Sequence, residues 1–303
     1  MNTDWQEKAG IVLAGIKQYR DYPMSELTTF KIGGPADLLV EPADVGQLAK
    51  VLEFCRDFSV PWMLLGLGSN LLVRDKGIRG VVIKLAGEFL TWERDGGTVR
   101  AGAGVTLGDL SRETARAGLT GLEFACGIPG TVGGAVYMNA GAYDGEMSQV
   151  LQRVQAYSLE HGLCWYSKDQ LELGYRKSRF QSRPEIIVRA EMSLTSADPA
   201  ACLEKIADLT FRRESKQPLE MPSAGSVFRR PEGHYVGPLI EKAGLKGYSI
   251  GGAQVSPKHA GFIVNTGGAT ADNVLCLIAH IQREIQSRFG VELVPEIKVV
   301  GEE

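Results

Sequence analysis

The 303-residue chain lacks the features that mark several common classes of protein. Its formal net charge is −3, which excludes the basic surface that nonspecific binding to nucleic acid requires. Its five cysteines are scattered and form no C-x-x-C pair, as is typical of a protein in a reducing cytoplasm. Its four histidines share no ligand spacing. We therefore expect no metal and no nucleic-acid partner.

The N-terminus also lacks the pattern of a targeting signal. Asp4 and Glu7 stand where a secretory signal peptide would be basic and then apolar. We therefore expect a cytoplasmic protein without membrane insertion.

A long uncharged stretch lies between Glu123 and Asp144, and it is the most informative part of the chain. Its length would suit a membrane span, but five glycines and Pro129 make a spanning helix unfavourable. The composition favours a buried, closely folded backbone that presents its N–H groups to a large ligand. No Lys or Arg occurs between Arg116 and Arg153, so a phosphate here would be held by backbone amides rather than by a lysine.

Hydrophobic periodicity and turn residues predict a small α/β lobe up to about Leu85, a middle lobe with a mixed or antiparallel sheet, and a third lobe. The expected helices lie at 3–20, 45–58, 107–117 and 199–216, with one more between the cap Thr270 and the stop Gly290. The expected strands lie at 36–40, 60–65, 71–74, 80–84, 90–94, 98–101, 150–159, 162–167, 186–194 and 291–300. We divide the chain into a helical extension at 1–22, two lobes at 23–86 and 87–197, and a C-terminal domain at 198–303.

Several short motifs each allow a plain and a functional interpretation. Gly66-Leu-Gly-Ser-Asn70 is either a tight turn or a second ligand loop, and it lacks the rest of a Rossmann fingerprint. Tyr175-Arg-Lys-Ser-Arg179 is either a solvated basic turn or an anion site. The cations of Arg212-Arg-Glu-Ser-Lys216 complement a helix dipole by default, although Lys216 could bind a diphosphate.

Ser226 and Glu296 are ambiguous on their own in the same way. Ser226 follows a glycine without forming a G-x-S-x-G elbow, so it could simply belong to a turn. Glu296 follows Pro295 on the polar face of the expected last strand, where a solvated glutamate is common.

Seven motifs in a fixed order give the chain a resemblance to a known family. They are Thr28-Thr-Phe-Lys-Ile-Gly-Gly-Pro-Ala36, Gly66-Leu-Gly-Ser-Asn70, Gly127-Ile-Pro-Gly-Thr-Val-Gly-Gly-Ala135, Asn139-Ala-Gly-Ala-Tyr143, Tyr175-Arg-Lys-Ser-Arg-Phe180, Ala224-Gly-Ser-Val-Phe228 and Pro295-Glu-Ile297. With them the chain resembles the UDP-N-acetylenolpyruvoylglucosamine reductases (UDP-N-acetylmuramate dehydrogenases) of bacterial peptidoglycan synthesis. The short distance from Phe180 to Pro199 resembles the branch that lacks an inserted tyrosine loop.

The resemblance implies the fold, the cofactor and the reaction. The fold would be α+β, with a two-lobed FAD-binding domain of the vanillyl-alcohol-oxidase type and a C-terminal substrate-binding domain. FAD would be noncovalent, and NADPH would reduce it, leave, and be replaced by UDP-N-acetylglucosamine enolpyruvate. Hydride would then move from flavin N5 to the vinyl carbon distal to the ether oxygen. We expect a bacterial cytoplasmic enzyme that is a monomer or weak oligomer.

The resemblance also implies roles for particular residues. Arg176 and Glu296 would stabilise an enediolate-like intermediate, and Ser226 would protonate the adjacent carbon. Substrate contacts would come from Tyr175, Lys216, Arg229 and Lys258. The cofactor would lie near Gly66, Leu67, Gly68, Ser69, Asn70, Leu71, Gly127, Ile128, Pro129, Gly130, Thr131, Gly133, Gly134, Ala135, Asn139, Gly141, Ala142 and Tyr143.

Two other functions remain as alternatives. An oxidase of the same fold would share the glycine loops, but its reduced flavin would react quickly with oxygen and slowly with the enolpyruvyl sugar. A non-catalytic flavin or nucleotide-binding module would keep its ligand even if Arg176, Ser226 and Glu296 were replaced.

Overall fold

The computed structural model describes residues 4–303, and its first helix is shorter than expected. Helix α1 covers Asp4–Val12, and the expected start at residue 3 lies outside the described residues. The expected continuation to residue 20 is wrong, because Lys17–Pro23 form strand β1. Gly15 has a φ of +88°, a left-handed conformation that ends the helical path at low cost.

The chain folds into two compact units, each assembled from three stretches of sequence. The first unit contains the residues up to Tyr19, Leu38–Gly66 and Val81–Arg213, and the second contains Arg20–Asp37, Leu67–Gly80 and Glu214–Glu303. Each unit has its own core of buried aliphatic and aromatic side chains. The division of the chain into four consecutive segments, given above, stays a prediction.

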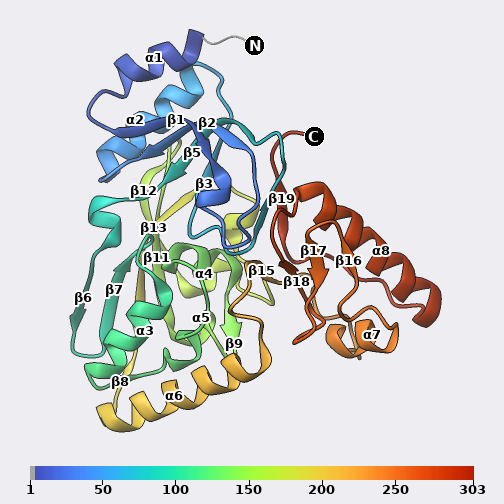
Figure 1. Ribbon diagram of the computed structural model, residues 1–303. Helices are drawn as coiled ribbons and strands as arrows, with labels where there is room; N and C mark the ends of the chain where they lie inside the picture. Colours follow the sequence, from blue (N-terminus) through green and yellow to red (C-terminus); the bar gives the residue numbers. More distant parts are fainter. Residues whose placement is uncertain (1–3) are drawn as a thin grey trace. The chain divides into compact units, whose positions relative to one another are not determined.

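The strand–helix–strand pattern expected near the start is confirmed. Strand β2 (Pro35–Glu41) leads to helix α2 (Val45–Asp57) and strand β3 (Trp62–Leu65). The sheet order is β1-β2-β5-β3, where β5 covers Ile78–Lys84 and runs parallel to β3 (Figure 1). A parallel pair needs such a crossover connection.

The middle of the chain forms a sheet that is antiparallel, one of the two arrangements (mixed or antiparallel) that the sequence predicts. The strand order is β12-β11-β13-β7-β6. The bounds are Trp92–Asp95 for β6, Thr98–Gly102 for β7, Leu151–Ser158 for β11, Gly162–Ser167 for β12 and Ile186–Ser193 for β13. Helix α4 (Val132–Met138) packs on strands β7 and β13.

Helix α4 was not predicted from the sequence, since its segment was expected to be a glycine-rich loop. Thr131 caps the helix through its side chain, and Asn139 ends it with a left-handed φ of +41°. A Cβ on Gly133 would lie 2.9 Å from the Cβ of Ala103. The glycine therefore allows the helix to approach the chain after β7 more closely than an alanine would.

The second unit contains an antiparallel sheet, a parallel strand pair and two helices. The sheet order is β15-β18-β17-β16, and β19 runs parallel to β4. The bounds are Leu71–Val73 for β4, Ser223–Ser226 for β15, Val236–Lys242 for α7, Ser249–Ile250 for β16, Ala253–Val255 for β17, Phe262–Asn265 for β18, Ala271–Phe289 for α8 and Lys298–Val300 for β19. Helix α8 begins after Thr270 and ends at Gly290, as predicted.

The expected strand 291–300 is wrong over most of its length. Only Lys298–Val300 are extended in a ladder, and Pro295 makes a single isolated bridge to Phe228. Proline has no N–H to donate, which interrupts a ladder at that position. The alternating pattern reflects the burial of Leu293 and Ile297, whereas Val299 is 38% exposed.

The remaining elements are short connections, apart from two helices. Helices α3 and α6 match their expected ranges, and Asp198 caps α6 by accepting from the amide of Ala200. The bounds are Met24–Glu26 for η1, Gly87–Leu90 for η2, Leu107–Arg116 for α3, Leu119–Thr120 for β8, Glu123–Ala125 for η3, Gly141–Ala142 for β9, Gly145–Glu146 for β10, Met147–Val150 for α5, Lys168–Leu171 for η4, Arg179–Gln181 for η5, Thr195–Ser196 for β14 and Pro199–Lys216 for α6.

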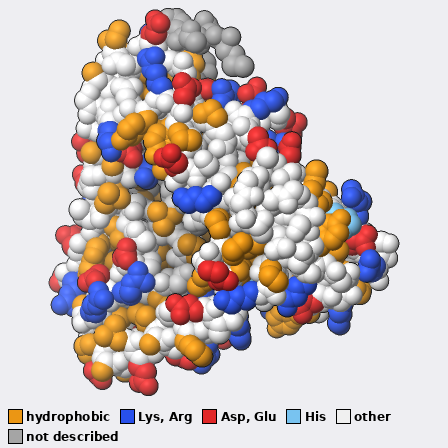
Figure 2. Space-filling view, viewed as in Figure 1, with side chains coloured by type: hydrophobic (Ala, Val, Ile, Leu, Met, Phe, Trp, Pro, Cys, Tyr) orange, Lys and Arg blue, Asp and Glu red, His pale blue; other side chains and the backbone are white. Residues whose placement is uncertain are grey.

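Two surface properties bear on function. Within residues 4–303, no helix combines the length and the apolar character that crossing a bilayer would need. Figure 2 shows acidic and basic side chains interspersed over the visible face rather than gathered into one basic patch.

Candidate active site

The glycine-rich segment 127–135 bends tightly and then enters α4, so several of its amides bond within the protein. The amide of Val132 donates to the carbonyl oxygen of Val105, and that of Gly133 donates to Ala103, both at 2.8 Å. These donors are therefore not available to a ligand.

Three other amides of the segment remain available. The N–H groups of Gly127, Gly130 and Thr131 find no acceptor within the part of the chain that the structure describes. The Oγ1 atom of Thr131 accepts from the amide of Gly134 at 3.2 Å. The amides of this segment that could bind a phosphate, as the sequence predicts, are therefore those of these three residues. Ile128 and Pro129 lie in the bend between them, and Ala135 lies in α4.

Arg213 of α6 lies against this segment, although it is distant in the sequence. A Cβ on Gly127 would come 2.7 Å from the Cδ of Arg213 and 3.3 Å from its Nε. That Nε is buried and has no hydrogen-bond partner. Burial lowers the pKa of the guanidinium, and nearby Tyr143 and Cys126 oppose that effect. Because arginine starts from so high a pKa, the group stays charged at neutral pH.

The contact with Arg213 places a cation beside a segment for which the sequence predicted only backbone amides as phosphate donors. The sequence signal was the basic end of helix 199–216, where only Lys216 was considered for binding. The fold supplies a guanidinium to a stretch that has no charge of its own. An unpaired buried donor next to unpaired amides is the arrangement that an anion requires.

One further predicted cofactor position, Gly66, borders the same segment, and three others lie in a nearby hairpin. A Cβ on Gly66 would lie 3.0 Å from the Oγ1 of Thr131, so the end of the first glycine motif touches the second. Strands β9 and β10 form a hairpin that includes Gly141 and Ala142. Tyr143 occupies its tip with a φ of +52° and is partly exposed.

Arg176 lies in a tight turn within the first unit. Gly174 and Lys177 exchange two backbone hydrogen bonds of 3.1 Å, which makes Tyr175 and Arg176 the two central residues. Arg176 has a φ of +53°, which is uncommon for a residue with a side chain. Tyr175 is 60% exposed. The turn thus presents two side chains of the predicted substrate site next to each other.

Ser226 and Glu296 are brought together in the second unit by backbone pairing. The amide of Glu296 donates to the carbonyl oxygen of Val227 at 2.7 Å, directly after Ser226. The side-chain amide of Asn70 donates to the carbonyl oxygen of Glu296 at 3.3 Å. Ser226 is exposed at the end of β15. The predicted proton donor, the predicted glutamate and the predicted loop residue Asn70 therefore lie in one local cluster.

The loop that leads to Asn70 is held by the second unit as well. A Cβ on Gly68 would lie 2.3 Å from the carbonyl oxygen of Leu27, and Gly68 has a φ of +62°. Only glycine fits this position without displacing the backbone of the Thr28–Ala36 motif. Leu67 is partly exposed, and Ser69 and Leu71 are half-buried.

The cations predicted to bind substrate differ in their surroundings. Arg229 has a buried Nε without a hydrogen-bond partner, while its own amide bonds to Val294 at 2.9 Å. Lys258 pairs with Glu220 at 3.5 Å. Lys216 is exposed at the end of α6. Of these three cations, Arg229 has the buried, unpaired donor that an anionic ligand would stabilise most.

The predicted residues form two groups, one in each unit. Gly66, segment 127–135, Asn139, Gly141–Tyr143, Tyr175 and Arg176 belong to the first unit, together with Arg213. The second unit contains Leu67–Leu71, Lys216, Ser226, Arg229, Lys258 and Glu296. Over residues 4–303 no cluster of three or more His, Cys, Asp or Glu side chains is placed to hold a metal ion.

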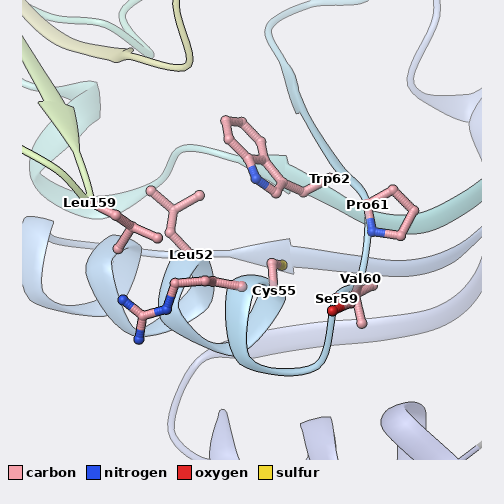
Figure 3. A pocket seen from close by; sticks show the side chains of 8 residues that line it. Leu52, Cys55, Ser59, Val60, Pro61, Trp62 and Leu159 are labelled. Carbon is pink, nitrogen blue, oxygen red and sulfur yellow. The ribbon is translucent and has the colours of Figure 1, made fainter.

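A surface hollow elsewhere in the first unit has the wrong chemistry for this site. It has a volume of about 480 Å³ and is lined by Leu52, Cys55, Arg56, Ser59, Val60, Pro61, Trp62 and Leu159. Figure 3 shows apolar side chains of α2 and of the start of β3 around it, with Leu159 opposite. Burial raises the pKa of the Cys55 thiol to about 12, so this thiol is not a nucleophile at neutral pH.

Comparisons with known proteins identify two family profiles and several relatives that match the chain. Residues 36–162 match the family profile "FAD binding domain", and residues 217–300 match "UDP-N-acetylenolpyruvoylglucosamine reductase, C-terminal domain". A UDP-N-acetylenolpyruvoylglucosamine reductase of Clostridium botulinum (strain Eklund 17B / Type B) is 50% identical over 280 residues, 92% of either chain. One of Syntrophomonas wolfei is 50% identical over 281 residues, 93% of this chain and 94% of the relative.

A solved structure extends the similarity to three dimensions. The crystal structure of UDP-N-acetylenolpyruvylglucosamine reductase (MurB) from Thermus caldophilus has a TM-score of 0.80 and 38% identity, and covers 94% of this chain and 98% of that chain. The fold and the matched domains define a flavoprotein with a separate C-terminal domain. The chain belongs to the UDP-N-acetylenolpyruvoylglucosamine reductase family. The expected family, fold class and FAD-binding domain are thereby confirmed.

Proposed function

We propose that this protein reduces the enolpyruvyl ether of UDP-N-acetylglucosamine to the lactyl ether, with NADPH as the electron donor. Its membership of the reductase family over more than nine-tenths of its length supports this reaction. The observation that carries the proposal is the unpaired donor set at the glycine-rich segment. FAD, when bound there, accepts a hydride from NADPH and passes it to the carbon–carbon double bond of the substrate.

The residues of the first unit fit an anionic cofactor. The buried Nε of Arg213 lacks a partner, and the amides of Gly127, Gly130 and Thr131 are available beside it. A diphosphate supplies acceptors for donors of both kinds. We therefore add Arg213 to the cofactor residues expected from the sequence.

Arg176, Glu296 and Ser226 are assigned to the substrate. Hydride addition to the vinyl carbon places negative charge on the carboxylate end of the substrate. A guanidinium can fork onto both carboxylate oxygens, so Arg176 stabilises that charge. Glu296 is assigned to the same charged intermediate, in line with the resemblance. Ser226 then donates a proton to the carbon next to the ether oxygen.

The remaining cations suit the diphosphate of a UDP-sugar. Arg229 brings an unpaired buried Nε, and Lys258 can exchange Glu220 for a phosphate. Lys216 and Tyr175 present exposed polar groups. Each is proposed as a substrate contact, in line with the resemblance.

We place the enzyme in the bacterial cytoplasm as a monomer or weak oligomer. The cytoplasm supplies NADPH, and the five cysteines are free thiols, as a reducing compartment requires. Sedimentation of the purified protein at several concentrations would measure the oligomeric state.

A comparison of the two half-reactions tests the proposed function. The Ser226→Ala variant should keep flavin reduction by NADPH and lose flavin reoxidation by the enolpyruvyl sugar by about 100-fold or more, the usual scale for removing a proton donor. Rapid-mixing absorbance spectroscopy of the flavin measures both rates. Ser223→Ala, on the same strand, serves as the control and should change neither.

Two outcomes would contradict the proposal. Equal loss in both half-reactions would remove Ser226 as the proton donor. Wild-type flavin that is reoxidised quickly by oxygen and not by the enolpyruvyl sugar would instead support an oxidase.

A further inference from the structure

The turn that carries Arg176 is fastened to the C-terminal end of α4 by side-chain hydrogen bonds. Asn139 Nδ2 donates to the carbonyl oxygen of Gly174 at 3.1 Å. Ser178 Oγ and Gln181 Nε2 both donate to the carbonyl oxygen of Tyr137, at 2.7 and 2.8 Å. The carbonyl oxygen of Tyr137 lies in the last turn of α4, where it has no hydrogen-bond partner within the helix.

Gln181 also holds the turn directly. Its Nε2 donates to the carbonyl oxygen of Arg176 at 3.0 Å, in addition to its bond to Tyr137. One amide group therefore links the last turn of α4 with the backbone of Arg176. Asn139, Ser178 and Gln181 together form what we call the α4 clamp.

Asn139 is the buried centre of this clamp. Its side chain is 1% exposed, and its Oδ1 accepts from the amide of Ser148 at 2.9 Å. Both ends of the side-chain amide are thus occupied within the protein. Its φ of +41° is in the left-handed region, which asparagine tolerates better than most residues. The side chain suits a structural link better than direct contact with a cofactor.

The backbone of Arg176 requires such a link. A residue with a side chain is strained at a φ of +53°, and it keeps this conformation when neighbouring contacts fix it. Here two backbone bonds between Gly174 and Lys177 close the turn, and Asn139 and Gln181 fasten the closed turn to the end of α4. The opposite end of α4 begins at Thr131, which borders the unpaired amides described above. Helix α4 has seven residues and is only about 10 Å long. The position of one end therefore closely determines the position of the other end.

We propose that Asn139 is a positioning residue that ties the guanidinium of Arg176 to the cofactor-bearing segment through α4. The inference rests on the proposed function, because it gives Arg176 a substrate carboxylate to bind. Through the α4 clamp, the distance between the hydride donor and the carboxylate-binding group is set by one short helix. The clamp acts on the substrate half-reaction and leaves the first half-reaction alone.

The Asn139→Asp variant tests this inference most sharply. Aspartate keeps an acceptor for Ser148 and tolerates the left-handed conformation, but it cannot donate to Gly174. Flavin content and the rate of flavin reduction by NADPH should stay within about twofold of wild type. Flavin reoxidation by the enolpyruvyl sugar should fall by about 10- to 100-fold, the loss expected when a buried carbonyl loses its partner.

A second variant keeps the test valid if Asn139→Asp folds poorly. Gln181→Ala removes two clamp bonds from a side chain nearer the surface and should show the same split between half-reactions. Gln254→Ala is the matched control, since Gln254 Nε2 makes a similar bond to the carbonyl oxygen of Gly247 in the second unit. The control should leave both rates unchanged.

The outcomes separate this inference from the proposed function. Equal loss in both half-reactions in Asn139→Asp and Gln181→Ala would make the clamp a general structural feature and overturn the inference. Wild-type rates in both variants would also overturn it. Failure of the wild-type flavin to be reoxidised by the enolpyruvyl sugar would overturn the proposed function instead.

Discussion

Arg213, which we propose as a cofactor residue, could not be recognised from the sequence. Its guanidinium reaches Gly127 only because α6 returns to the glycine-rich segment. The motifs around Gly66, Gly127 and Arg176 could be recognised because their residues are adjacent in the chain. A contact between distant residues leaves no such pattern, so the sequence predicted only backbone amides for a phosphate at this segment.

The Arg213→Met variant tests the role of this cation. Methionine keeps much of the length of the side chain and removes the charge. We expect FAD affinity to fall by about 10- to 100-fold, since a hydrogen bond to a charged group contributes about 1.5–3 kcal/mol. Apoprotein stability should not decrease, because an unpaired buried donor is lost. Fluorescence titration with FAD and thermal unfolding provide the two measurements.

Arg116→Met is a control for the Arg213 experiment. Arg116 is an exposed residue that pairs with Glu113 on α3. Unchanged FAD affinity in Arg213→Met, or an equal loss in Arg116→Met, would show that Arg213 does not hold the cofactor.

Arg176 allows function and backbone preference to be separated. Glycine adopts its φ of +53° without strain. Arg176→Gly should therefore change the free energy of unfolding by less than about 1 kcal/mol. Flavin reoxidation by the enolpyruvyl sugar should fall by about 100- to 1,000-fold, as when a preorganised charge-stabilising donor is removed. Denaturant titration and rapid mixing measure the two effects. Retained reoxidation would remove Arg176 from the site.

Elements with local end signals were predicted well. Thr270 and Gly290 mark α8, and Asp198 and Pro218 mark α6. The failures have local causes too. Gly15 ends α1 early, and Pro295 interrupts the last strand. The glycines of α4 made its segment look like a loop, although packing on the middle sheet stabilises it as a helix. Helix propensity alone could not predict α4, because tertiary contacts outweigh the cost of its glycines.

Helix α6 is linked to the start of the glycine-rich segment by a buried carboxylate. Glu123 is 2% exposed and accepts from Thr120 Oγ1, from the amide of Gly121 and from Lys205 Nζ of α6. Burial is the largest influence and raises the pKa of this carboxyl. The hydrogen bonds and Lys205 together outweigh it, so the pKa lies below its ordinary value.

This lowered pKa predicts how stability depends on pH. Glu123 binds its proton more weakly in the folded state than in the unfolded state. Its contribution is therefore fully present above the unfolded pKa, near 4.5, and is lost as the pH falls through the lower folded value. Urea unfolding at a series of pH values should show a shallower acid dependence in Glu123→Gln. An identical acid dependence in wild type and variant would contradict this assignment.

At the scale of the whole molecule, the sequence motifs divide between two units that each have a core. The FAD-binding profile at 36–162 also includes Leu67–Gly80 of the second unit, and the C-terminal profile at 217–300 lies within that unit. The proposed cofactor residues lie in both units, because Leu67–Leu71 belong to the second unit and segment 127–135 to the first. Of the residues proposed for the substrate chemistry, Arg176 lies in the first unit, and Ser226 and Glu296 lie in the second.

The central claim is that the enolpyruvyl sugar, rather than oxygen, reoxidises the flavin. The direct measurement mixes the NADPH-reduced protein with UDP-N-acetylglucosamine enolpyruvate in the absence of oxygen and follows the flavin absorbance. We predict full return of the oxidised spectrum in a single turnover, with one lactyl ether formed for each flavin. A flavin that stays reduced until oxygen is admitted would contradict the claim.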